Sequence, residues 1–211
     1  MAAVAKERLK SPRARLFVAL DLPERVREGL VAWQREALTD PALRPVPAEA
    51  LHVTLCFLAY QAERDIEPIA ETMCSAGARR VPARFEEEPV AVPPGRPRLF
   101  AVDTESEGAK ILQAELSERL EAKGFYRPEK RPFWPHVTVA RIKPTKRSAS
   151  DRRGRRRGRP MRVEASPGAL PGELLEPFEA VRVTLYRSLL RPTGAEYVSL
   201  APLDLPSDGD G

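Results

Sequence analysis

Two short segments of the sequence share one pattern, LHVTL at residues 51–55 and PHVTV at residues 135–139. They contain the only two histidines of the chain, His52 and His136, and each histidine is followed by Val-Thr. With 16 valines and 8 threonines among 211 residues, this double coincidence has a chance probability on the order of 10⁻⁵, which indicates an internal repeat.

Both segments alternate apolar and polar residues, which is the period of a β-strand with one buried face. The apolar residues belong on the core face, and His52 and Thr54, like His136 and Thr138, belong on the opposite face. If an approximate twofold axis relates the two strands, the four polar side chains line one cleft, with a histidine on either side. We therefore expect a functional site between these strands.

Strands and helices alternate on both sides of the two motifs. Strands are predicted at residues 15–22, 51–58, 84–92, 98–104, 136–142, 180–189 and 196–205, and helices at residues 23–38, 64–76 and 107–123. Turn-forming residues at 93–95 and 191–194 predict hairpins, so part of the sheet must be antiparallel. This combination predicts an α+β fold rather than a doubly wound parallel sheet.

The positive charge of the chain is concentrated in one segment. Residues 146–162 contain nine basic residues and one acid, so this segment carries +8 while the rest of the +5 chain sums to −3. Ser, Gly and Arg dominate residues 143–167 without any periodicity, which predicts a mobile, exposed loop. The body of the protein therefore lacks the uniformly basic surface of a general nucleic-acid binder. A compositional bias toward Ala, Arg and Pro explains the basic run equally well.

The rest of the composition describes a protein that can bury a core and has no membrane span. Hydrophobic residues make up 42% of the chain, and its apolar runs fall far short of the roughly 18–20 residues that a membrane helix needs. Two cysteines are too few for a disulfide framework and fit a reducing compartment. We expect a cytoplasmic monomer with a basic N-terminal extension at residues 1–14, a single domain at 15–206 and a disordered tail at 207–211.

Two histidines and two hydroxyls around one cleft suit the hydrolysis of a phosphodiester without a metal ion. That reaction needs a base to take a proton from water and an acid to give one to the departing oxygen, and histidine can serve in both roles near neutral pH. The hydroxyls can donate hydrogen bonds to phosphate oxygens as negative charge builds on them.

The paired motifs and the segments around them resemble the RNA 2′,3′-cyclic phosphodiesterases, formerly named 2′,5′ RNA ligases, among the two-histidine phosphoesterases. The resemblance extends over RLFVALDLP at 15–23, LHVTLCFL at 51–58, PHVTVAR at 135–141 and LYRS at 185–188 followed by LRP at 190–192. It implies a bilobal fold, in which two pseudo-symmetric lobes of mixed or antiparallel sheet with outer helices surround a central cleft. It also implies hydrolysis of RNA 2′,3′-cyclic phosphate ends, or of a cyclic nucleotide, to a 2′-phosphate, with no metal or other cofactor.

The resemblance also implies roles for individual residues. His52 and His136 would form the acid–base pair, Thr54 and Thr138 would donate to phosphate oxygens, and Arg141 would contact the phosphate. By analogy His52 is the acid and His136 the base, but the sequence does not fix this order. Strict alternation places Arg141 opposite His136, so it reaches the cleft only if the strand bends or ends first.

Other residues near the motifs carry weaker expectations. Ala59 stands where the family often has a glycine. Phe57 and Trp134 could stack on a base, although aromatic residues beside a buried strand are more often core residues. Tyr186 and Arg187 match the closing strand of the family, and one of them could reach the cleft.

Two alternatives to a phosphoesterase remain at this stage. In the first, His52, His136 and Cys56, which alternation places on the face of His52, hold zinc, but zinc takes three or four protein ligands and the paired threonines would then have no purpose. In the second, the protein is an RNA-binding module that uses the basic loop without catalysis. Within the enzyme hypothesis, the physiological RNA and the balance between hydrolysis and ligation stay open, because a 5′-hydroxyl can replace water in the same site.

Overall fold

The computed structural model describes residues 12–145, 159–191 and 194–206. Its strands are β1 (Arg13–Asp21), β2 (Leu43–Pro45), β3 (His52–Ala62), β4 (Pro82–Phe85), β5 (Val90–Val92), β6 (Leu99–Glu105), β7 (His136–Ile142), β8 (Phe178–Glu179), β9 (Arg182–Arg191) and β10 (Gly194–Asp204). Its α-helices are α2 (Glu24–Ala37), α3 (Ile66–Cys74), α4 (Glu107–Ala122) and α5 (Gly172–Leu175), and η1 (Ala48–Ala50) and η2 (Glu63–Asp65) are single 3₁₀ turns.

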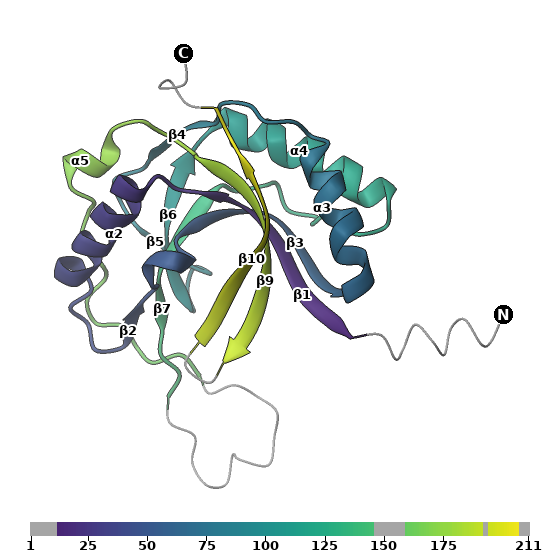
Figure 1. The fold of residues 1–211 in the computed structure, drawn as a ribbon. Helices are drawn as coiled ribbons and strands as arrows, with labels where there is room; N and C mark the ends of the chain where they lie inside the picture. Colours follow the sequence, from purple (N-terminus) through teal and green to yellow (C-terminus); the bar gives the residue numbers. More distant parts are fainter. Residues whose placement is uncertain (1–11, 146–158, 192–193, 207–211) are drawn as a thin grey trace, which may run out of the picture.

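The strands form one antiparallel sheet in the order β10-β9-β1-β3-β7-β6-β4-β8, with β2 paired to β7 and β5 paired to β6. The two halves of the sheet meet where Val53 on β3 pairs with Val137 on β7. Helices cover the sheet on its outer sides, with α2 and α5 near one half and α3 and α4 near the other (Figure 1). The predicted α+β fold with two lobes is confirmed.

The strands at the centre repeat one local arrangement in each half. On β1 and β3 the paired residues are Ala19 with Thr54, Leu20 with Val53 and Asp21 with His52. On β6 and β7 they are Ala101 with Thr138, Val102 with Val137 and Asp103 with His136. The pairing therefore relates the two halves by the approximate twofold symmetry that the repeated motif predicts.

The helices bury the faces that their apolar spacing predicts. On α2 these are Val26, Leu30 and Trp33, and on α4 the residues at spacing four, from Leu112 to Leu120, are almost fully buried. Each such leucine contributes on the order of 1.5–3 kcal/mol of hydrophobic stabilisation. The side chain of Ser106 caps α4 by accepting a hydrogen bond from the Ala109 N–H at 3.1 Å.

Three details of the predicted element pattern are wrong. The strand expected at residues 84–92 is split into β4 and β5, because three glutamates and a proline at residues 86–89 interrupt it. The pattern missed β2, since three residues are too few to show a period. β1 begins at Arg13, two residues before the predicted strand.

The predicted loop at residues 143–167 is ordered at both ends. The Thr145 N–H donates to the Arg159 carbonyl at 2.7 Å and the Met161 N–H to the Lys143 carbonyl at 2.8 Å. The carboxylate of Asp40 accepts from the backbone N–H groups of Glu164 and Ala165, and these bonds lower its pKa. Residues 146–158, which hold most of the basic run, lie outside the described residues, as do most of the N-terminal extension and the tail at 207–211. No helix of the described residues is long and apolar enough to cross a membrane.

Candidate active site

The four polar side chains of the repeated motif lie together at the centre of the sheet. Continuing the Val53–Val137 register by one residue in each direction sets His52 beside Thr138 and Thr54 beside His136. All four side chains line one cavity of about 380 Å³. The structure therefore brings together all four residues that the sequence pattern singles out.

Arg141 lines the same cavity because β7 contains a β-bulge. β6 pairs Ala101 with Thr138 and Phe100 with Ala140, so Val139 has no register partner. Val139 and Ala140 are both fully buried, and the alternation resumes with Arg141 on the face of His136. The strand bends as the expectation for Arg141 required.

A matching bulge in β3 reverses which faces of the sheet Cys56 and Phe57 point to. β1 pairs Ala19 with Thr54 and Val18 with Cys56, and Leu55 is skipped. Cys56 is therefore buried in the core, where burial raises the pKa of its thiol to about 12. The expectation that Cys56 shares the face of His52 is wrong, because alternation alone takes no account of the bulge. Phe57, the counterpart of Arg141, is 39% exposed.

The buried side chain of Gln34 on α2 holds the bulge of β7 in place. Its Nε2 donates to the Val139 carbonyl at 2.7 Å and to the Val46 carbonyl at 3.0 Å. The Val46 N–H donates to the same Val139 oxygen at 3.0 Å. The sequence analysis did not single out Gln34, although a polar residue next to Trp33 and four positions after Leu30 lies near the apolar face of the helix.

Three aromatic rings surround the imidazole of His52. Phe17 stacks on it with ring centroids 5.1 Å apart, Tyr186 lies parallel at 6.0 Å, and Tyr197 meets it edge-on at 5.4 Å. Burial, and after it the nearby positive charge of Arg141, together lower the pKa of His52 to about 4. His52 is therefore neutral near pH 7.

A half-buried carboxylate fixes one of these rings. The hydroxyls of Tyr186 and Thr184 both donate to Asp21 at 2.8 Å, and Asp21 is also the register partner of His52. Burial raises the pKa of Asp21, and the two hydroxyl donors partly offset this effect. Of the two closing-strand residues that the sequence analysis named, Tyr186 thus packs against His52, whereas Arg187 pairs with Glu63 at 2.7 Å.

His136 has a different environment from His52. Its Nδ1 lies 2.8 Å from the carbonyl oxygen of Trp134. A carbonyl oxygen only accepts hydrogen bonds, so Nδ1 carries the hydrogen and Nε2 of the neutral ring is an acceptor. The indole of Trp134 stacks on the imidazole with centroids 4.0 Å apart and an interplanar angle of 19°. The tautomer and the ring plane of His136 are therefore both fixed by Trp134.

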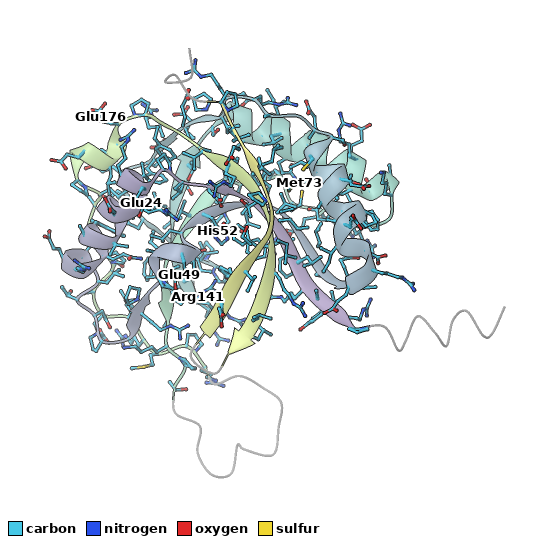
Figure 2. All side chains as sticks on the ribbon, viewed as in Figure 1. Glu24, Glu49, His52, Met73, Arg141 and Glu176 are labelled. Carbon is cyan, nitrogen blue, oxygen red and sulfur yellow. The ribbon has the colours of Figure 1, made fainter. Side chains whose placement is uncertain are left out.

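Charged side chains from other elements complete the wall of the cavity. Arg44 comes from β2, Glu49 from η1 and Glu196 from β10. Figure 2 shows Glu49 and Arg141 near His52 at the centre of the molecule. Within the described residues, no group of three or more His, Cys, Asp or Glu side chains is arranged to hold a metal ion.

Comparison with known sequences relates the chain to one enzyme family. The family model of the 2′-5′ RNA ligase superfamily matches residues 22–155. An RNA 2′,3′-cyclic phosphodiesterase of Thermus thermophilus is 33% identical over 136 residues, which cover 61% of this chain and 69% of that protein. An RNA 2′,3′-cyclic phosphodiesterase of Methanocaldococcus jannaschii is 26% identical over 187 residues, which cover 87% of this chain and 96% of that protein.

Solved structures show the same fold. A Thermus thermophilus protein of known crystal structure matches with a TM-score of 0.72 and 26% identity, covering 92% of this chain and 99% of that one. Escherichia coli LigT, crystallised with 3′-AMP, matches with a TM-score of 0.69 and 22% identity, covering 93% and 100%. The fold and the paired His-x-Thr strands are those of a two-histidine phosphoesterase. Within that class, the chain belongs to the 2′-5′ RNA ligase superfamily.

Proposed function

We propose that this protein hydrolyses the 2′,3′-cyclic phosphate at the end of an RNA, or of a cyclic nucleotide, to a 2′-phosphate without a metal ion. The observation that carries the proposal is the convergence of two imidazoles, two threonine hydroxyls and the guanidinium of Arg141 on a single cavity. The names of the relatives support the same substrate class.

The catalytic step divides between the two histidines according to their surroundings. Nε2 of His136, held as an acceptor by the Trp134 carbonyl, takes a proton from water as the water oxygen attacks phosphorus. The bond from phosphorus to O3′ breaks, and protonated His52 gives its proton to O3′. Thr54 and Thr138 donate to the non-bridging oxygens, and the guanidinium of Arg141 balances their negative charge.

The acidic role of His52 requires a proton that its lowered pKa does not supply at pH 7. Burial and the charge of Arg141 keep the pKa of His52 low, but the anionic phosphate between these side chains opposes both effects. His52 therefore takes up its proton together with the substrate and releases it to the departing oxygen. This coupling of proton uptake to substrate binding is a physical reason for His52 to be the acid and His136 the base, as the resemblance to the family implied.

The same residues can open the cyclic phosphate with a 5′-hydroxyl in place of water, which joins two RNA ends. His136 then takes the proton of that hydroxyl, the bond to O3′ breaks as before, and a 2′,5′ linkage forms. Only the nucleophile differs, so substrate supply and equilibrium decide between hydrolysis and ligation.

The test is the hydrolysis of cytidine 2′,3′-cyclic phosphate in the presence of EDTA, with the product identified by phosphorus NMR. We expect cytidine 2′-phosphate as the product and an unchanged rate in EDTA. Production of the 3′-phosphate, loss of activity in EDTA, or no turnover by the folded protein would each contradict the proposal.

The RNA-binding alternative depends mainly on residues 146–158, which lie outside the described residues. Deleting residues 146–159 separates the two roles. In the enzyme, deletion weakens salt-dependent binding of long RNA and spares turnover of the mononucleotide. We also propose that the protein acts as a monomer. We place it in the cytoplasm, a reducing compartment that fits the free thiols of Cys56 and Cys74.

A further inference from the structure

We propose that Arg44 forms a second anion subsite in the cleft, which binds the phosphodiester on the 5′ side of the terminal nucleotide of an RNA. The inference rests on the proposed function, because it places this phosphate relative to the reacting one. In this proposal β2, a strand that carries no sequence motif, recognises the RNA chain on the 5′ side of the terminal cyclic phosphate.

The first observation is that two arginines are direct neighbours across a strand pair. In the antiparallel pair of β2 and β7, Arg44 is the register partner of Arg141. Partners in an antiparallel pair lie about 4.5–5.5 Å apart at their Cα atoms and point to the same face of the sheet. Both side chains are exposed and both line the cavity.

Like charges at directly opposed positions destabilise a sheet. A phosphate bound between the guanidinium groups of Arg44 and Arg141 would offset their mutual repulsion. Two carboxylates, Glu49 and Glu196, line the same cavity.

The second observation distinguishes the two arginines by their place in the cleft. The charge of Arg141 acts on His52, which puts it at the reacting phosphate. Arg44 lies on β2, which pairs with residues 140–142 of β7. This part of β7 follows the bulge at Val139 and lies past the point where β3 pairs with β7. The 380 Å³ cavity lies at the small end of the roughly 300–1,000 Å³ range of ligand sites and suits a single nucleotide.

A single bound nucleotide leaves the next phosphate of the RNA at the mouth of the cavity. Arg44 is exposed and adjacent to Arg141, so its guanidinium can reach a phosphate that is separated from the reacting one by a single ribose. Arginine binds phosphate oxygens bidentately, which adds orientation as well as charge. A mononucleotide cyclic phosphate lacks this second phosphate, so the subsite distinguishes an RNA end from a free cyclic nucleotide.

The test compares cytidine 2′,3′-cyclic phosphate with the dinucleotide that carries the same cyclic end. In Arg44→Gln we expect the ratio of kcat/KM for the dinucleotide to kcat/KM for the mononucleotide to fall about tenfold, as for the loss of one charged hydrogen-bonded contact. Arg44→Lys should restore part of the ratio. Arg35→Gln, which removes another exposed positive charge, on α2, is the matched control and should leave the ratio unchanged. The salt dependence of the dinucleotide reaction should weaken by about 0.7 in its logarithmic slope in Arg44→Gln.

Two results would overturn the inference. An equal loss on both substrates would place Arg44 at the reacting phosphate, and an unchanged ratio in Arg44→Gln would remove the subsite altogether. If the wild type turns over neither substrate, the proposed function fails instead. The subsite is then tested by calorimetric measurement of the affinity for the dinucleotide in Arg44→Gln, Arg44→Lys and Arg35→Gln. A loss of affinity confined to Arg44→Gln supports the subsite, and equal affinity in all three variants contradicts it.

Discussion

Binding of an anion in the cleft should be coupled to the uptake of a proton by His52. The imidazole lies among three aromatic rings, and its pKa of about 4 means that protonation at pH 7 costs about 4 kcal/mol, or three pH units at 1.36 kcal/mol each. A negative charge about 4 Å away at an effective dielectric constant of about 20 returns about 4 kcal/mol. The pKa of His52 in the complex should therefore rise to about 7.

The sign of the pH dependence follows from this difference. Between about pH 4 and pH 7 the free site is neutral and the occupied site is protonated, so binding takes up close to one proton at pH 5 to 6. Affinity should fall by about tenfold for each unit of increasing pH in this window, and the dependence should level off above pH 7.

Inorganic sulfate is a suitable probe because it does not titrate in this range. We would measure its binding by calorimetry in buffers of different ionisation enthalpy, which counts the protons taken up, for the wild type and for His52→Gln. The uptake should fall by about one proton in His52→Gln. Equal uptake by the two proteins, or no dependence on the buffer in either, would refute the account of His52.

Three further changes test the supports of the site. Ala59 has a positive φ of 55°, which costs a residue other than glycine about 1–2 kcal/mol, so Ala59→Gly should stabilise the protein by up to about 1 kcal/mol and raise Tm by about 2–4 °C. Ala62→Gly, at the ordinary φ of −69° on the same strand, should destabilise it by about 0.5–1 kcal/mol, and a loss of stability in both variants would contradict this reasoning. Gln34→Leu should lower the free energy of unfolding in urea by about 1–3 kcal/mol and reduce kcat through Arg141; full activity would show that the bulge needs no support from α2. Trp134→Leu keeps the carbonyl that binds His136 but removes the stacked ring, and kcat should fall severalfold with little change in KM, whereas Trp134→Phe should retain most of the rate.

The sequence predicted the centre of the molecule well because strand alternation and a repeated motif both act there. A period of two residues placed His52 and Thr54 on one face, and the second copy of the motif predicted the strand that pairs with it. Helix periodicity predicted the buried faces of α2 and α4, since apolar residues three and four apart must share a side.

The faces on which residues after the motifs lie depend on β-bulges, and the alternation of apolar and polar residues in the sequence does not reveal a bulge. Cys56 was assigned to the wrong face, and Arg141 reached the cleft only because the bulge at Val139 reverses the alternation. Gln34, which holds that bulge, comes from a helix more than 100 residues away in sequence. Such contacts arise from tertiary packing, so local pattern could not reveal them.

The glycine expected at position 59 shows how a family pattern carries backbone information. The sequence shows alanine at this position, but only the structure shows that its φ angle is positive, a conformation that favours glycine. Similarly, the aromatic surroundings of His52 combine β1, β9 and β10, and the sequence named only Tyr186 among these rings.

The central claim is that His52 and His136 act as acid and base in one step, and a double-mutant comparison tests it most directly. Initial rates of cytidine 2′,3′-cyclic phosphate hydrolysis in EDTA would be measured for the wild type, His52→Ala, His136→Ala and the double variant. If both groups serve the same step, each single change should cost at least about 10²-fold, and the double variant should be little slower than the slower single variant. Retention of substantial activity by either single variant would contradict the account.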